Sequence, residues 1–467
     1  VGCAHARMGA TDVVPFVPVS ELTMDDCVEL ARRLGQRIGD ELEVPVFLYE
    51  FAATRPERQS LAQIRQGEYE ALPDKLQDPD FAPDFGPARF VPRFGAMVIG
   101  ARKFLIAYNV DLNVTDKRWA NRVAFDVREK GRTVTDADGK KVQQPGLLKA
   151  VRGVGWYIPE YGCAQVSMNL VDIDVTPLHA AFDACDERAR ARGIRVTGSE
   201  LVGLLPKKSM VDAGRHYLKR MARSPGVPEK DVVHTAIRSL GLSEVAPFDP
   251  AEKVIDYILA PERPLASMTL QEFGDETSRE SAAPGGGSVA ALAGALGAAL
   301  ASMVANLPHP KKAYEGVRDD LERVSVRAQE LKQQLLDAID EDTWSFQRLM
   351  EAKKVTGPER EAAVRDATLG AARVPLTVTV ACPEIFELCA KAREIGKAAS
   401  SSDAGVGATM ARACAVGAAM NVRINLMDMA DDPEAHELQL RADQALQQTE
   451  ERAAEVVGEV WRLLGRA

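Results

Sequence analysis

The sequence predicts an α/β part followed by an all-α helical bundle. Up to about residue 258, short apolar strands alternate with amphipathic helices, whereas strand patterns nearly vanish beyond residue 267. The order of elements in the first part repeats, which predicts two ferredoxin-like βαββαβ subdomains, the first of them incomplete at its N-terminus. We therefore expect two subdomains, a linker and a helical domain at residues 1–103, 104–258, 259–266 and 267–467.

Composition and charge exclude several classes of protein. The chain has 467 residues, of which 46% are hydrophobic and 27% are charged, so it is globular rather than disordered. A net charge of −10 leaves no domain-wide basic surface and argues against nucleic-acid binding. The seven cysteines form no CxxC pair, which predicts reduced thiols in the cytoplasm and no metal site. No signal peptide is expected.

The first subdomain begins with a strand–helix–strand pattern. Strands at 13–19 and 44–49 flank a helix at 23–42, which Thr23 can cap and whose first turn holds Asp25 and Asp26. A proline-rich stretch at 78–96 predicts a long loop. Because the second subdomain shows about twice as many elements, we expect half a βαβ unit to precede Val1, and the chain to be a fragment or to begin at a non-standard start codon.

The second subdomain shows a fuller alternation of strands and helices. Residues 103–114 alternate apolar and polar residues, which predicts a strand whose Asn109, Asp111 and Asn113 face a ligand. Two short helices follow the last strand, up to about residue 258. The other predicted elements are a helix, a strand, a helix and a strand at 116–128, 165–172, 177–192 and 195–205.

The residue pattern of the C-terminal part predicts helices throughout. Residues 282–308 carry no charge, and a run of about 20 residues can span a bilayer about 30 Å thick. Its Ala, Gly and Ser residues partition weakly, and Leu292, Leu296 and Leu300 recur every four residues. A buried helix is therefore favoured over a membrane span. Further helices are predicted at 319–350, 358–373, 378–396, 404–429 and 433–464.

A glycine-rich turn precedes this uncharged helix. Gly285, Gly286 and Gly287 are followed by Ser288 and the small-residue run. Such a turn presents free N–H groups and the positive end of a helix dipole, which suit an anionic or electron-rich ligand. It matches neither a Walker A motif nor a GxGxxG turn after a strand. A helix-capping turn is the alternative, although three glycines exceed what a cap requires.

Two features of the first subdomain suit catalysis or binding. His5 lies just before the first strand, where it can act as a base, although a surface histidine near a chain end is the commoner explanation. The loop at 86–95 offers aromatic faces for a flat heterocycle and arginines for carboxylates, with a well-packed proline-rich loop as the alternative. This loop comprises Gly86, Pro87, Ala88, Arg89, Phe90, Val91, Pro92, Arg93, Phe94 and Gly95.

The helical part contains a carboxylate cluster, Asp340, Glu341 and Asp342. Its spacing from Ser345 and Phe346 allows Asp342 to face inward while its neighbours face water, although an acidic surface turn is the commoner arrangement. A desolvated carboxyl has a raised pKa and can act as a general acid; a solvated acidic surface is the alternative.

Asn421 and Asn425 are four residues apart and share one helix face. They can hold an amide-rich ligand or pack polar groups between helices, and packing is the commoner arrangement.

Longer segments carry a family resemblance. HARMGATDVVPFVPV, GEYEALPDKL, APDFGPARFVP and GARKFLIAYNVDL resemble glutamate formimidoyltransferase. SAAPGGGSVAALAGALGAALASMV, the DED cluster and NVRINL resemble formimidoyltetrahydrofolate cyclodeaminase. Their order resembles the bifunctional formimidoyltransferase-cyclodeaminase family of histidine breakdown, over essentially the whole chain. The sequence departs from the family at Ala6, where proline is usual, and before His5, where members carry further residues.

The resemblance implies two successive reactions. The first moves the formimidoyl group from N-formimidoyl-L-glutamate to N5 of tetrahydrofolate, the co-substrate, with His5 as base and the 86–95 loop binding folate. The second closes the ring to 5,10-methenyltetrahydrofolate and releases ammonia, with Asp342 as general acid and the 285–288 turn as a wall of the folate pocket. Arginines and lysines are expected to attract the polyglutamate tail, namely Arg89, Arg93, Lys311 and Lys312.

The resemblance also implies a cytoplasmic homo-oligomer, a ring of dimers built partly through the small-residue helices. No membrane span, nucleic acid or metal is expected. The alternative function is a folate-binding, oligomeric cyclodeaminase whose truncated transferase domain is inactive.

Overall fold

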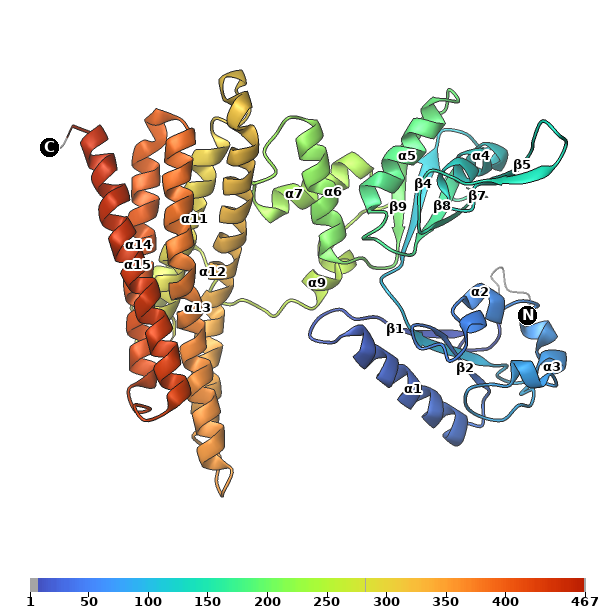
Figure 1. The fold of residues 1–467 in the computed structure, drawn as a ribbon, viewed down its shortest axis with the longest axis horizontal. Coiled ribbons are helices and arrows are strands. Elements are labelled where there is room, and N and C mark those ends of the chain that lie inside the picture. Colours follow the sequence, from blue (N-terminus) through green and yellow to red (C-terminus); the bar gives the residue numbers. More distant parts are fainter. Residues whose placement is uncertain (1–6, 282, 466–467) are drawn as a thin grey trace. The chain divides into compact units, whose positions relative to one another are not determined.

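The computed structural model describes residues 7–281 and 283–465. These residues form two compact units that divide between Leu205 and Pro206 (Figure 1). Within the described residues, the first unit contains the two larger sheets and the second unit is helical. The division falls inside the expected 104–258 subdomain, because the segment after residue 205 hydrogen-bonds to the C-terminal bundle, for example between Ser224 Oγ and Ser325 Oγ at 3.1 Å.

The first sheet is parallel, with strand order β1-β3-β2. Its strands are β1 (Val13–Phe16), β2 (Val46–Glu50) and β3 (Met97–Ala101). Helix α1 (Met24–Glu41) packs on one face, and the short helices α2 (Leu61–Ile64) and α3 (Leu72–Lys75) pack on the other. The expected cap is confirmed: the Thr23 hydroxyl accepts a hydrogen bond from the Asp26 N–H group, and the Asp26 carboxylate accepts one from the Thr23 N–H group at 2.8 Å.

The second sheet is antiparallel, with strand order β7-β8-β4-β9. Helices α4 (Lys117–Val127) and α5 (Leu178–Arg190) pack against it. A separate hairpin, β5 (Arg132–Thr135) and β6 (Lys141–Gln144), projects from the subdomain (Figure 1). The strands of the sheet are β4 (Ile106–Leu112), β7 (Val151–Ile158), β8 (Cys163–Leu170) and β9 (Val196–Val202).

The expected repeat of the two subdomains is wrong for the described residues, because the first sheet is parallel and the second antiparallel. Strands β3, β5, β6 and β7 were not predicted from the sequence. Strand β7 contains Gly153 and Gly155, and glycine weakens strand signals. Gly155 is required by packing, since a Cβ there would lie 2.1 Å from the Asn121 backbone nitrogen.

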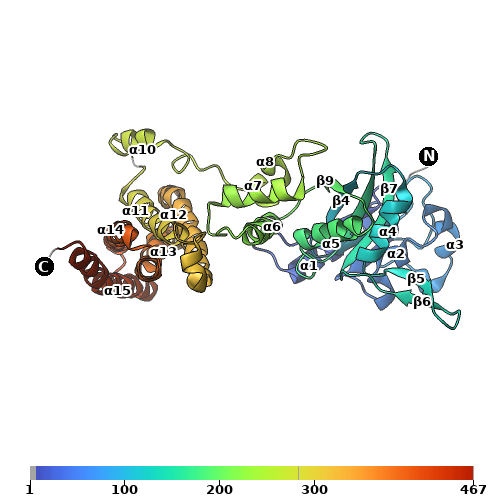
Figure 2. The ribbon, with the colours of Figure 1, turned by 90° about the horizontal axis from the view of Figure 1, so that it is seen from above.

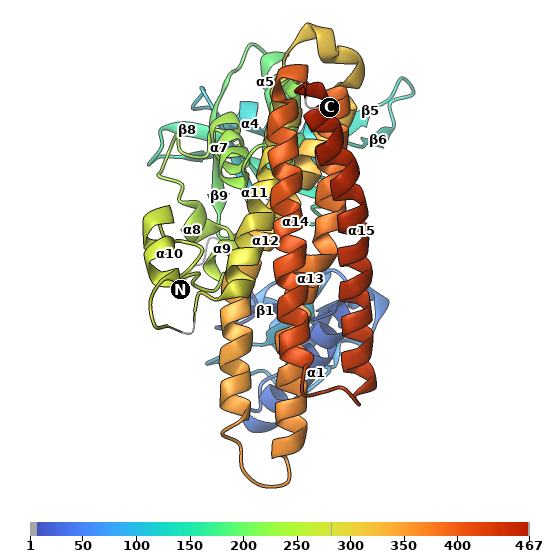
Figure 3. The same cartoon turned by 90° about the vertical axis from the view of Figure 1, so that its left-hand side faces the viewer.

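The second unit begins with four helices, α6 (Lys207–Arg220), α7 (Glu229–Leu240), α8 (Pro250–Lys253) and α9 (Ile255–Ile258). Helix α10 (Leu270–Thr277) lies outside the bundle in the view of Figure 2. Figure 3 shows the remaining helices side by side, with α11 packed against α12, α13 and α14. They are α11 (Gly286–Asn306), α12 (Arg318–Ala352), α13 (Arg360–Ile395), α14 (Ser401–Leu426) and α15 (Pro433–Leu463).

Small residues let α11 and α14 approach closely. A Cβ on Gly297 would lie 2.8 Å from the Gly407 carbonyl oxygen, and a Cβ on Gly294 would lie 2.6 Å from Cys414 Sγ. Both helices α11 and α13 are long and apolar enough to cross a membrane by length and composition, yet 61% of the apolar window of each is buried inside the bundle. This burial supports the expectation that α11 is a core helix.

Helix α13 corrects one expectation. Two helices were predicted, at 358–373 and 378–396, whereas one helix runs through Pro375 and Pro383. Pro375 has no N–H group to donate to the Ala371 carbonyl, and Asn425 Nδ2 of α14 donates to that oxygen instead, at 2.9 Å. Burial of α13 in the bundle and this replacement hydrogen bond offset the cost of the proline.

Candidate functional site

The carboxylate of Asp342 lies against the glycine turn. Helix α11 starts at Gly286 with Gly285 as its N-cap, and a Cβ on Gly287 would lie 2.2 Å from Asp342 Oδ1. The buried Ser288 Oγ donates to the Ile339 carbonyl oxygen at 2.9 Å and lies 3.3 Å from Asp342 Oδ2. The turn and the carboxylate, which are 54 residues apart in the chain, therefore form one site.

Burial raises the pKa of Asp342, while hydrogen bonds from the Ser288 hydroxyl and N–H group lower it; the net pKa is raised. The half-buried carboxyl group thus keeps its proton to higher pH than an exposed aspartate does. A carboxyl group with a raised pKa beside backbone donors can give a proton to a departing amine and take one from an attacking nitrogen.

The three neighbouring acids have three different environments. Asp342 faces the turn, and Glu341 is ion-paired with Arg348 at 2.5 Å. The expectation that both neighbours of Asp342 face water is wrong for Asp340, which is 1% exposed. Its two carboxylate oxygens accept the N–H groups of Leu265 at 2.9 Å and Ala266 at 3.0 Å, which fixes the linker to α12.

We therefore expect Asp340→Ala to lower the free energy of unfolding of the helical unit by on the order of 3 kcal/mol, because two buried N–H groups lose a charged acceptor. Denaturant unfolding followed by circular dichroism measures this. A loss below about 0.5 kcal/mol, the range of ordinary surface substitutions, would contradict the assigned role.

The two asparagines have separate roles. Asn425 satisfies the Ala371 carbonyl, which is a packing role. Asn421 Nδ2 donates to the Gly417 carbonyl at 2.8 Å, and the same nitrogen would lie 3.4 Å from a Cβ on Gly286. Asn421 therefore borders the glycine turn on the α14 side, while Asp342 borders it on the α12 side.

Lys311 and Lys312 do not lie near this turn within one chain. They follow the C-terminal end of α11, a helix of 21 residues, and so lie about 30 Å from its N-terminus. Their expected attraction for the polyglutamate tail stays a prediction. Arg89 is ion-paired with the exposed Glu43.

In the first unit, the 86–95 loop ends beside the segment that follows His5. Gly9 and Gly95 form a β-bridge, and Ala10 N–H donates to the Phe94 carbonyl at 2.8 Å. Tyr69 supports the loop, since its hydroxyl donates to the Pro92 carbonyl at 2.6 Å. His5 itself lies outside the described residues.

A cavity of about 600 Å³ lies between the two sheets of the first unit. Arg65 in its wall is ion-paired with Asp12, which accepts the Met8 N–H group at 2.6 Å. The cavity wall is thus tied to the segment that follows His5. Its lining comprises Val13, Pro15, Tyr49, Glu50, Phe51, Leu61, Arg65, Arg102, Lys103, Leu105, Arg152, Val171 and Asp172.

Sequence reasoning missed this cavity. Glu50 ends β2 and Arg102 follows β3, and ligands commonly bind at the carboxyl ends of parallel strands. That rule was a usable signal, but applying it required β3, which was not predicted.

The polar side of β4 was expected to face a ligand, and it faces its neighbours. Asn109 Nδ2 donates to Glu200 Oε2 at 3.0 Å, and Gln165 Nε2 donates to Asp111 Oδ1 at 2.6 Å. Asn113 Oδ1 accepts the Arg195 N–H group at 2.8 Å. These side chains form a largely internal network.

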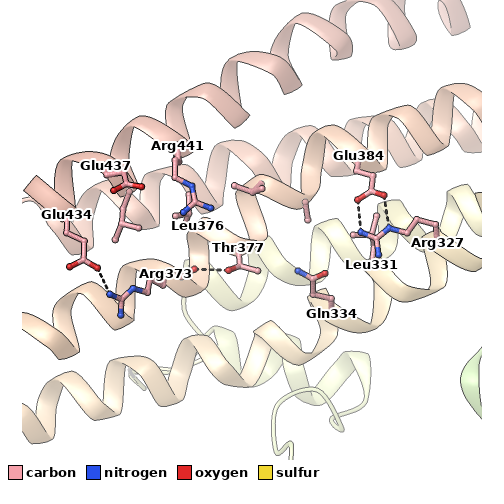
Figure 4. A pocket seen from close by; sticks show the side chains of 13 residues that line it. Arg327, Leu331, Gln334, Arg373, Leu376, Thr377, Glu384, Glu434, Glu437 and Arg441 are labelled. Carbon is pink, nitrogen blue, oxygen red and sulfur yellow. Dashed lines mark hydrogen bonds and ion pairs between the residues drawn. The ribbon is translucent and has the colours of Figure 1, made fainter. Parts of the chain in front are cut away.

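A groove of about 510 Å³ runs between α12, α13 and α15 (Figure 4). Four of its charged residues form two ion pairs: Arg327 contacts both carboxylate oxygens of Glu384, at 2.6 and 2.8 Å, and Arg373 pairs with Glu434. Its lining includes none of the expected site residues. We assign the candidate sites to the glycine turn and to the cavity instead.

Comparisons with known proteins match both parts of the chain. Family models described as "Formiminotransferase domain, N-terminal subdomain", "Formiminotransferase domain" and "Formiminotransferase-cyclodeaminase" match residues 2–102, 107–260 and 269–444. The formimidoyltransferase-cyclodeaminase of Mus musculus is 41% identical over 463 residues, which cover 97% of this chain and 84% of the mouse protein.

Two relatives resemble parts of the chain. The glutamate formimidoyltransferase of Streptococcus pyogenes serotype M1 is 40% identical over 215 residues, which are 46% of this chain and 67% of that protein. The methenyltetrahydrofolate cyclohydrolase of Methylorubrum extorquens is 37% identical over 175 residues, which are 36% of this chain and 84% of that protein.

Proposed function

The chain belongs to the formimidoyltransferase-cyclodeaminase family, and we propose that its two candidate sites carry out two successive steps on one folate. It is a folate-dependent enzyme with a transferase part and a cyclodeaminase part. Family matches to both parts argue against the alternative in which the transferase is inactive. The bounds of these matches support the expected domains at 1–103, 104–258 and 267–467, joined by the linker at 259–266.

The first step transfers the formimidoyl group from N-formimidoyl-L-glutamate to tetrahydrofolate. N5 of the folate attacks the amidine carbon, the bond from that carbon to the glutamate nitrogen breaks, and glutamate leaves. The proton lost by N5 goes to a base, for which we propose His5, and the departing nitrogen gains a proton. The 86–95 loop is the proposed folate contact. Its arginines are exposed, and its last residue, Gly95, pairs with the segment that follows His5.

The second step closes the ring in the helical unit. N10 attacks the amidine carbon of 5-formimidoyltetrahydrofolate, the bond from that carbon to the terminal nitrogen breaks, and 5,10-methenyltetrahydrofolate and ammonia form. The proton released by N10 must reach the departing nitrogen, and we propose that Asp342 carries it. Both steps exchange C–N bonds and protons, so the proposal uses no metal.

One observation carries the cyclodeaminase proposal: the half-buried Asp342 carboxylate, with its raised pKa, lies directly against Gly287 and Ser288. The test is to supply the full chain with 5-formimidoyltetrahydrofolate and to follow the methenyl product by its ultraviolet absorbance and ammonia by a coupled assay. Absence of both products would refute the proposal.

A second candidate activity has specific support. The relative from Methylorubrum extorquens carries the name methenyltetrahydrofolate cyclohydrolase. A site that binds the methenyl compound can also admit water to its ring carbon. We favour ring closure, because the family match and the longer similarity to the mouse protein both name the cyclodeaminase.

We further propose a cytoplasmic homo-oligomer, built as a ring of dimers, that acts in histidine degradation. Exposed apolar side chains recur at intervals of seven or fourteen residues along the neighbouring helices α11 and α14, multiples of the heptad spacing that is typical of helix–helix contacts. They are Val289, Leu296 and Met303 on α11, Val406 and Met420 on α14, and Met427 directly after α14. A second copy of this face is the proposed occupant.

We expect Met420→Glu to reduce the molar mass measured by sedimentation equilibrium, because a charge at a residue that is 63% exposed would be desolvated only in the assembly. Gln448→Glu, on an exposed position of α15, is the matched control and should leave the mass unchanged. Wild-type protein that sediments as a monomer would refute the oligomer.

A further inference from the structure

We propose that Glu50 binds the amidinium group of N-formimidoyl-L-glutamate and makes the transferase selective for that cation over a neutral N-acyl glutamate. The inference rests on the proposed transferase function, since it assigns the part of the cavity that binds the transferred group. It is drawn from the charges that line the cavity in the first unit.

Half of the charged residues that line the cavity already have ion-pair partners. Lys103 is ion-paired with Asp172 at 2.6 Å, and Arg65 is ion-paired with Asp12. Glu50 has no ion pair or hydrogen bond from its carboxylate among residues 7–281 and 283–465, and it is half-buried. The cavity therefore offers one unpaired acid.

Two cations near Glu50 also remain available. Burial raises the pKa of Glu50, and the nearby guanidinium groups of Arg152 and Arg102 oppose that rise in part. Arg102 donates to the Lys103 backbone oxygen at 3.0 Å and also interacts with the Tyr49 hydroxyl, and no carboxylate is paired with it among the described residues. Tyr49 is 2% exposed, and its hydroxyl lies beside the Arg102 guanidinium in the wall of the cavity.

The backbone holds Glu50 in an unusual conformation. Its φ of 53° lies in the left-handed region, which side chains other than glycine rarely adopt. The turn is fixed on both sides: Phe51 N–H donates to the Ala101 carbonyl at 3.0 Å, and Ala53 N–H donates to the Glu50 carbonyl at 3.1 Å. Strained residues of this kind cluster at functional sites.

The charges match those of the substrate. Amidines are strong bases, so near neutral pH N-formimidoyl-L-glutamate carries one amidinium and two carboxylates. A carboxylate binds a planar amidinium through two parallel N–H···O bonds, as it binds a guanidinium. Arg102 and Arg152 suit the carboxylates. The one unpaired carboxylate and the two available arginines of the cavity therefore match the one amidinium and two carboxylates of this ligand.

The same arrangement predicts selectivity. N-formyl-L-glutamate has the same two carboxylates, but an uncharged oxygen replaces the amidinium nitrogen. In its complex, Glu50 would face that oxygen and remain buried without a cation, which is a repulsive and desolvated arrangement. Sites built to pair with a polar group reject ligands that lack it.

The experiment is isothermal titration of the full chain with both ligands. Wild type should bind N-formimidoyl-L-glutamate roughly tenfold to a hundredfold more tightly than N-formyl-L-glutamate. Glu50→Gln should lose that preference, whereas Arg152→Gln should weaken both ligands and keep it. Glu57→Gln, an exposed residue outside the cavity lining, is the control and should match wild type.

A preference that persists in Glu50→Gln would overturn the inference while leaving the transferase proposal intact. Wild-type protein that binds neither ligand would overturn the transferase function itself. Unchanged melting temperature and tetrahydrofolate binding in Glu50→Gln establish that the variant is folded, so a lost preference then reports the lost carboxylate.

Discussion

Asp342→Asn should lower kcat for closure of 5-formimidoyltetrahydrofolate by roughly 10²–10⁴-fold, the range expected when a general acid–base group is lost. The amide keeps the size of the carboxyl group and can still accept from Ser288, but it cannot carry a proton between N10 and the departing amine. Initial rates of methenyl formation and of ammonia release measure the effect. An Asp342→Asn rate within about fivefold of wild type would exclude the proposed role.

The neighbouring acid provides the control. Glu341→Gln removes a carboxylate one residue away, but that carboxylate is ion-paired with Arg348 on the surface of α12. The kcat of the Glu341→Gln variant should equal that of wild type. A comparable loss in both variants would indicate a general effect of the acidic cluster.

The pH dependence of stability follows from the same carboxyl group. Because the pKa of Asp342 is raised in the folded state, folding favours its protonated form. The stability that protonated Asp342 contributes is fully present below its unfolded-state pKa and is lost as pH rises through its folded-state pKa. The free energy of unfolding of wild type, relative to Asp342→Asn, should therefore fall across that interval.

Gly287→Ala should reduce ring closure at least about 100-fold, because displacing a catalytic group by about 1 Å costs that much. The new methyl group would lie within 2.6 Å of Asp342 Oδ1, Cγ and Oδ2, so the carboxylate must move. Alanine normally stabilises a helix relative to glycine, by about 1 kcal/mol. Here we expect loss of activity and no such gain in stability.

The matched substitution is Gly370→Ala in α13, where a Cβ would meet nothing within 4 Å. It should preserve activity and raise the melting temperature slightly. Gly287→Ala with wild-type kcat would show that Asp342 does not act from its position against the turn.

Much of the fold follows from local patterns. The α1 cap, the α11 core helix and the long bundle helices correspond to periodicity and capping residues that the sequence displays. The helical spacing around Asp342 indicated an inward carboxylate, and the residue does face the turn.

What escaped prediction depends on tertiary partners. Pro375 looked like a helix break because the asparagine that satisfies Ala371 comes 54 residues later. Asp340 looked solvated because the N–H groups that bind it lie in the linker. Glu50 was not predicted as a site residue because its arginine neighbours lie far along the chain, Arg102 just after β3 and Arg152 in β7. Such pairings are set by packing, which no local pattern records.

The measurement that tests the central claim most directly is the balance of products made by the wild-type chain. With 5-formimidoyltetrahydrofolate, we expect one ammonia for each methenyl product, at equal rates, and with 5,10-methenyltetrahydrofolate we expect hydrolysis no faster than in buffer. Accelerated hydrolysis of the methenyl compound, without ammonia from the formimidoyl compound, would contradict the account and establish a cyclohydrolase.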